Sequence, residues 1–99
     1  MDTIPKQLPV PAAASADPRA FELLRVWAAG GKQHVSLATG AWEDPAVWGL
    51  MLLDLAKHIA DAYELTTGID CASALERIKA GFDAEWAEAT DVPTGGLQP

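Results

Sequence analysis

Apolar residues recur between positions 21 and 38 in two runs, "ELLRVWAA" and "KQHVSL", which flank the pair Gly30-Gly31. Glycine adopts the positive backbone angles that two-residue hairpin turns require. With the glycines in the turn, Trp27 lies opposite His34 and Val26 lies opposite Val35. The pattern therefore predicts a β-hairpin with a defined register.

The two faces of this hairpin carry different residues, because successive side chains of a strand point to opposite sides. One face, called here the first face, consists of Leu24, Val26, Val35 and Leu37. The second face consists of Phe21, Leu23, Arg25, Trp27, His34, Ser36 and Ala38. An isolated two-stranded ribbon is marginal in water, so we expect helices to cover the first face. The second face is too apolar for ordinary solvation and needs a cover of its own, which the N-terminal arm, a second subunit or a ligand could supply.

Two helices are predicted after the hairpin. Asp44 can cap the first, with Pro45 at its first position, and Gly68 can end it. Asp70 can cap the second, whose apolar stripe recurs at helical spacing through Leu75, Ile78, Phe82 and Trp86. The connection between them is short, so the helices are antiparallel. We expect an α+β fold in which a β-hairpin is followed by an antiparallel two-helix hairpin, in the order ββαα.

The first helix has one polar face, and that face becomes apolar toward the helix start at Val47, Leu50 and Met51. We expect this start to be buried on more than one side. The polar part carries Asp54, His58 and Asp61, which are weak candidates for metal ligands. Structural zinc normally has four protein ligands, and the chain holds only two histidines and one cysteine. We therefore expect a solvated face, with no metal and no cofactor.

Proline and glycine delimit the folded unit. Residues 1–17 contain three prolines and the run "AAASAD", which favours a flexible arm. Residues 91–99 contain two prolines and two glycines, which favours a flexible tail. We expect a single domain over residues 19–90, since 99 residues leave no room for two.

Charge narrows the functional classes. Seven Lys and Arg against fourteen Asp and Glu give a net charge of −7, which disfavours binding to nucleic acid and to anionic membranes. No stretch has the length of a membrane span or of a signal peptide. One cysteine, Cys71, cannot form an internal disulfide and suits a reducing compartment. The expected location is the cytoplasm.

The segments "ELLRVW", "HVSL", "WEDPAVWG" and "DLAKHIADAY" together resemble a family of small bacterial proteins, found largely in alphaproteobacteria, catalogued as domain of unknown function 5076. The resemblance covers about residues 19–65. It implies a bacterial cytosolic protein, and it carries over no catalytic residue.

The candidate chemistry lies on the second face, where Arg25, Trp27 and His34 come together. They could form a platform for a small anion or carboxylate, and the same residue types are enriched where proteins meet. A cysteine at a helix start, like Cys71, can be reactive or can be a small buried residue. We expect a non-enzymatic interaction module that binds a second copy of itself, through the second face and the start of the first helix, or binds an unidentified protein. The alternative is a small-molecule binder or weak enzyme that uses Arg25, Trp27 and His34.

Overall fold

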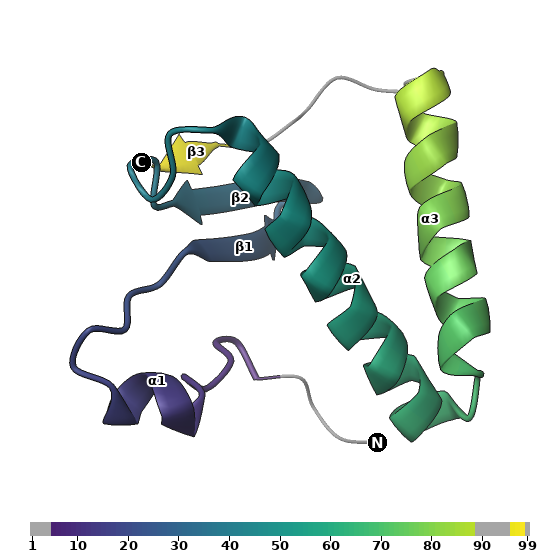
Figure 1. Cartoon of the computed structure of the whole chain (residues 1–99), viewed down its shortest axis with the longest axis horizontal. Coiled ribbons are helices and arrows are strands. Elements are labelled where there is room, and N and C mark those ends of the chain that lie inside the picture. Colours follow the sequence, from purple (N-terminus) through teal and green to yellow (C-terminus); the bar gives the residue numbers. More distant parts are fainter. Residues whose placement is uncertain (1–4, 89–95, 99) are drawn as a thin grey trace.

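A computed structural model describes residues 5–88 and 96–98 of the chain (Figure 1). The helix α1 (Ala12–Ala16) is followed by the strands β1 (Leu24–Ala29) and β2 (Lys32–Leu37). Two long helices come next, α2 (Pro45–Thr67) and α3 (Cys71–Ala87), and a short strand β3 (Leu97–Gln98) ends the described chain. The predicted α+β fold, a β-hairpin followed by two helices, is confirmed.

The hairpin has the predicted register. β1 and β2 are antiparallel, with Trp27 opposite His34 and Val26 opposite Val35. Gly30 and Gly31 form the turn with φ angles of 60° and 72°. Residues with a Cβ are strained at such angles, so the two glycines place the turn and thereby set the register.

Both helices begin, and α2 ends, where the capping residues predict. The Asp44 carboxylate accepts a hydrogen bond from the Ala46 amide, and Pro45 takes the first helical position of α2. Gly68 ends α2 with a φ of 78°. The Asp70 carboxylate accepts a hydrogen bond from the Ser73 amide at the start of α3. Among the described residues, neither helix combines the length and the apolar character needed to cross a membrane.

Two short elements lie in segments that were predicted as an arm and a tail. α1 forms in the run "AAASA", where alanine, the strongest helix former, outweighs the flanking prolines. β3 adds to β2 as a parallel strand, and the Val35 amide donates a hydrogen bond to the Gly96 carbonyl (2.9 Å). The sequence pattern did not predict this strand. Residues 1–4, 91–95 and 99 of the arm and tail lie outside the described residues.

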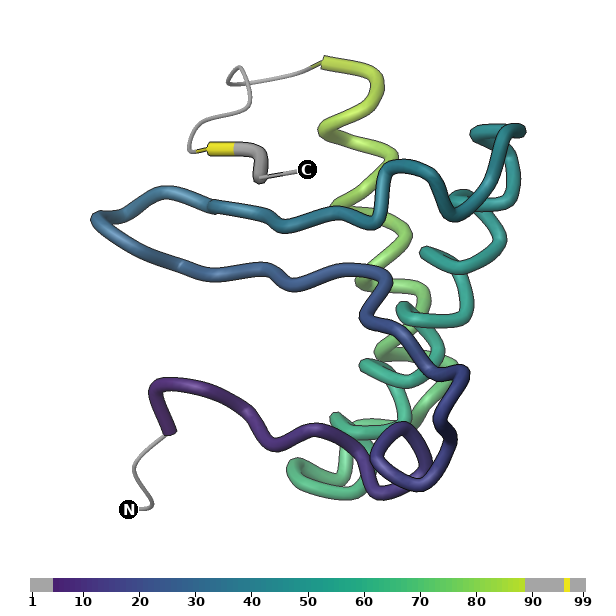
Figure 2. Tube along the Cα trace, turned by 90° about the vertical axis from the view of Figure 1, so that its left-hand side faces the viewer, coloured from purple at the N-terminus to yellow at the C-terminus, as the bar shows by residue number. Residues whose placement is uncertain are grey.

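The expectation that the helices cover the first face of the hairpin is wrong within one chain. No Cα atom of α2 or α3 lies within 8 Å of a Cα atom of the described strands. Figure 2 shows the hairpin projecting away from the helices, with its turn at the far end. Val26, at the middle of the first face, is 50% exposed. The chain turns at residues 38–41 before α2 begins, so the helix pair and the hairpin diverge instead of stacking.

The helices α2 and α3 pack on each other through small side chains. Ala60 on α2 and Ala74 on α3 are the only buried apolar residues in the described part of the chain. Larger apolar side chains remain open to solvent on both helices; they are Leu50, Leu52, Leu53, Leu55, Ile59, Tyr63, Leu65, Phe82 and Trp86. The described part of the chain therefore lacks the core that a domain of this size normally has.

Replacing Asp44 with alanine should destabilise the folded protein by about 1 kcal/mol, because the first amides of α2 lose their side-chain acceptor. Chemical unfolding followed by circular dichroism measures this change. Glu43→Ala is the matched control, because Glu43 is the exposed neighbour and caps no helix. Equal stability of the two variants would contradict the capping role.

Candidate functional site

The second face of the hairpin does not bring its three candidate residues into one site. Trp27 and His34 lie opposite each other and are half-buried. The Arg25 guanidinium instead pairs with the Glu22 carboxylate at 2.9 Å, just before β1. Because this pair is exposed, its contribution to stability is small. An anion that binds Arg25 must compete with Glu22 for Nη2 or bind Nε and Nη1 close to the Glu22 carboxylate, which repels it.

His34 takes part in the docking of the C-terminal strand. Its Nδ1 atom accepts a hydrogen bond from the Gly96 amide (2.9 Å), and the Val35 amide next to it donates to the Gly96 carbonyl. A ring nitrogen that accepts a hydrogen bond carries no proton, so the ring hydrogen lies on Nε2. A Cβ atom at position 96 would lie 3.4 Å from Nδ1, closer than most such contacts. Part of the cover that the second face needs thus comes from the chain's own C-terminal segment.

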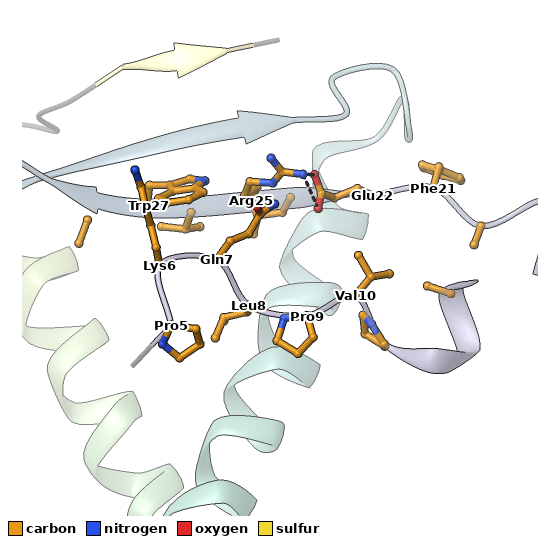
Figure 3. A pocket seen from close by; sticks show the side chains of 16 residues that line it. Pro5, Lys6, Gln7, Leu8, Pro9, Val10, Phe21, Glu22, Arg25 and Trp27 are labelled. Atoms are coloured by element: carbon orange, nitrogen blue, oxygen red, sulfur yellow. Dashed lines mark hydrogen bonds and ion pairs between the residues drawn. The ribbon is translucent and has the colours of Figure 1, made fainter. Parts of the chain in front are cut away.

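An open cavity of about 830 Å³ lies along the free edge of β1 (Figure 3). Residues 5–11 of the arm form one wall, and residues 20–28 form the other. Figure 3 shows Lys6 next to Trp27, with Arg25 and Glu22 joined by their ion pair further along the strand. Arg25 and Trp27 line this cavity, whereas His34 does not. The cavity is the concave feature closest to the predicted ligand platform.

The start of α2 is less buried than its sequence suggests. Val47 and Met51 are half-buried, but Leu50 is 67% exposed. Trp48 is held by Trp42, and the two rings meet edge to face with centroids 4.9 Å apart. The expectation that this start is buried on more than one side is therefore wrong for Leu50. The reason is that no other element packs over that side of α2.

The polar face of α2 remains open to solvent. Asp54, His58 and Asp61 are all exposed. Within residues 5–88 and 96–98, no three His, Cys, Asp or Glu side chains are close enough together to hold a metal ion. Asp61 has a different role, because its carboxylate accepts a hydrogen bond from the Cys71 thiol at 3.0 Å.

Cys71 is held by the end of α2. Its amide donates to the Glu64 carboxylate (2.8 Å), and its Sγ donates to Asp61. The hydrogen bond to Asp61, partial burial, and the nearby charges of Asp61, Glu64 and Asp70 raise the pKa of the Cys71 thiol to about 11. The carboxylates thus outweigh the helix-start effect that would make this thiol reactive. In the sequence, the feature that could have indicated this network is Asp61, an acidic residue one helical turn before Glu64 and close to the short connection between the helices.

Residues 7–90 match the family described as Domain of unknown function (DUF5076). The chain belongs to this family. The predicted resemblance is confirmed, and the match extends beyond residues 19–65 into the arm and through both helices.

A solved structure is similar to this DUF5076 protein over nearly its whole length. It comes from the photosynthetic bacterium Rhodopseudomonas palustrus CGA009 and is described as a "putative pyruvate dehydrogenase". The identity is 38%, the TM-score is 0.70, and the alignment covers 94% of this chain and 95% of the other. No curated protein matches the chain.

The raised pKa of about 11 predicts that Cys71 is alkylated slowly by iodoacetamide at pH 8. Because the thiolate is the reacting form, the rate should be about tenfold below that of an unperturbed thiol, after its higher intrinsic nucleophilicity is included. Asp61→Asn removes the largest cause of the shift and should move the pH midpoint of alkylation downward. Mass spectrometry of the adduct at a series of pH values measures both effects.

Asp54→Asn is the matched control for this experiment, since Asp54 lies on the same polar face and does not contact the thiol. It should leave the alkylation profile unchanged. A wild-type midpoint near 9 would show that Asp61 does not govern the thiol.

Proposed function

We propose that this protein is a small, non-enzymatic interaction module that works in the cytoplasm as an assembly with a second copy of itself. The observation that carries the proposal is the amount of surface that one chain leaves exposed. The free Cys71 thiol suits the reducing conditions of that compartment.

The surface area can be compared with that of ordinary monomers. The chain exposes 8567 Å², whereas a folded monomer of its mass, 10.5 kDa, exposes about 5,400 Å². The surplus is about 3,100 Å² on this scale. The twelve residues outside the described ranges contribute at most about 1,900 Å² as an extended chain, which leaves about 6,700 Å². A folded monomer of the remaining mass, about 9.3 kDa, exposes about 5,000 Å², so a surplus of about 1,700 Å² remains.

This surplus has the size of an obligate interface. Two chains that each hid about 1,700 to 3,100 Å² would together bury about 3,400 to 6,200 Å², and obligate dimers bury roughly 2,000 to 5,000 Å² or more. Partner surfaces of obligate dimers are also rich in apolar side chains. Nine large apolar side chains of the two helices are exposed here, beside the polar side chains that water normally covers. Two-fold pairing is the simplest arrangement that covers the same surface on both copies.

Two surfaces were proposed for this contact from the sequence. The start of α2, with Val47, Leu50 and Met51, has support from the exposure of Leu50. The second face of the hairpin has less support, because Arg25 pairs with Glu22 and His34 binds Gly96. We therefore place more weight on the helices than on Arg25, Trp27 and His34.

The wild-type protein should be dimeric in light scattering coupled to size-exclusion chromatography at micromolar concentrations. Leu50→Asp should weaken the dimer at least tenfold, because it places a charge on an apolar contact surface. Leu65→Asp is the matched control: Leu65 is 86% exposed and lies on the same face about four turns further along α2, beyond Asp54, His58 and Asp61 and away from the apolar start. A wild-type monomer at millimolar concentration would overturn the proposed function.

The alternative function, a small-carboxylate binder, has one specific observation in its favour. The cavity beside β1 holds Arg25 and Trp27, and the description of the similar solved structure names pyruvate, a small carboxylate. The Glu22 carboxylate already occupies Nη2 of Arg25 and repels a second anion, which lowers the affinity that we expect.

Titration calorimetry with pyruvate tests this alternative. A binder should show saturable heat that Arg25→Gln abolishes, because the fork donor is lost. Arg77→Gln is the control, because it removes a positive charge from α3, which does not line this cavity. It should leave the heat of binding unchanged. Absence of heat at millimolar pyruvate would remove the alternative.

A further inference from the structure

The first face of the hairpin and the apolar surface of the helix pair lack covers in the same chain. On the hairpin, Val26 is 50% exposed, the other three residues of the first face are half-buried, and no helix approaches the strands. On the helices, Ile59 is exposed beside the contact at Ala60, and Trp86 is 81% exposed. Phe82 and Trp86 stack on each other with ring centroids 5.7 Å apart, without further cover. Exposed aromatic pairs of this kind are typical anchors of protein interfaces.

The charges of the two parts are opposite. Residues 5–38, which include the hairpin, hold four basic and two acidic side chains, a net charge of +2. Residues 43–88, which include both helices, hold three basic and ten acidic side chains, a net charge of −7. Hairpin against helices is therefore the electrostatically favourable pairing between two copies, and helices against helices is the unfavourable one.

We propose that the dimer forms by reciprocal docking, in which the first face of each hairpin (Leu24, Val26, Val35, Leu37) packs on the apolar surface of α2 and α3 of the other copy. This inference rests on the proposed self-association and names the surfaces that meet. In this arrangement, helices do cover the first face of the hairpin, as the sequence pattern predicts, but these helices belong to the second chain. The projecting position of the hairpin in Figure 2 leaves the first face accessible for this contact.

Pairing of two copies through the free edges of β1 is the main competing arrangement. The outward amides and carbonyls of Leu24, Val26 and Ala28 are available in principle, because alternate residues of an antiparallel strand point away from their partner. However, residues 5–11 of the arm run along that edge and bound the cavity there (Figure 3). A second strand would have to displace the arm, whereas docking on the first face leaves the arm in place.

Reciprocal docking has a consequence for the cavity. Leu24 and Val26 belong to the first face and also line the cavity beside β1. The helices of the second copy would therefore close part of the opening of this cavity. Any small molecule bound there would contact both chains.

Cross-linking between two single-cysteine variants tests the arrangement. Val26→Cys and Ile59→Cys are made separately in a Cys71→Ser background, which retains a donor to Asp61. One variant carries an affinity tag, and the two are mixed, unfolded in urea and refolded together so that the chains exchange. A short bis-maleimide reagent is then added, and the tagged species are measured by mass spectrometry. Leu65→Cys, on the polar face, replaces Ile59→Cys as the control.

We expect the mixed sample to yield the cross-linked dimer of Val26→Cys with Ile59→Cys at least tenfold above the Leu65→Cys control. A cross-link mainly between two Val26→Cys chains would indicate edge or hairpin pairing and would overturn the inference while leaving the proposed function intact. A dimer in which neither cross-link forms would do the same. A wild-type monomer would overturn both. Leu37→Cys with Leu55→Cys is a second pair from the same surfaces, for use if either first variant fails to fold.

Discussion

The contact between α2 and α3 at Ala60 and Ala74 is the interaction on which the rest of the structure depends. Small side chains allow the helix axes to approach closely, but they bury little apolar area. The larger side chains, such as Ile59 and Trp86, therefore stay outside that contact. Since the hairpin does not lie over them, one chain has two incomplete halves of a core. A second chain can complete both halves, which is the physical reason to expect a dimer.

The connection between the two helices shows how acidic residues can hold a structure together in a protein of net charge −7. The Glu64 carboxylate accepts a hydrogen bond from the Cys71 amide, and the Glu64 backbone carbonyl accepts one from the Gly68 amide. The Asp61 carboxylate accepts a hydrogen bond from the Cys71 thiol. The start of α3 is thus anchored to the end of α2 by two carboxylates that act as hydrogen-bond acceptors. The same carboxylates keep the thiol protonated, so the position that could have been reactive is instead structural.

The candidate cluster on the second face illustrates what a register can and cannot determine. The register placed Trp27 and His34 opposite each other correctly, because pairing in a hairpin follows from the turn. It could not determine the partners of the side chains. Arg25 turns to Glu22, a near neighbour in sequence, and His34 binds Gly96, which is 62 residues away. The second contact depends on where the C-terminal segment returns, and no local pattern near Gly96 predicted a strand.

The sequence alone determined the hairpin and the starts of the two long helices, but not α1 or β3. Gly30-Gly31, Asp44, Gly68 and Asp70 act through their own backbone angles or through amides within three residues, so local chemistry was sufficient. Only the tertiary structure decided how the hairpin lies relative to the helices, because that orientation depends on the turn at residues 38–41 and on competition between distant apolar surfaces. The apolar pattern marked the residues that need a cover. It could not tell whether the same chain supplies it, because hydrophobic burial is non-directional and is satisfied equally by a neighbouring element or a second molecule.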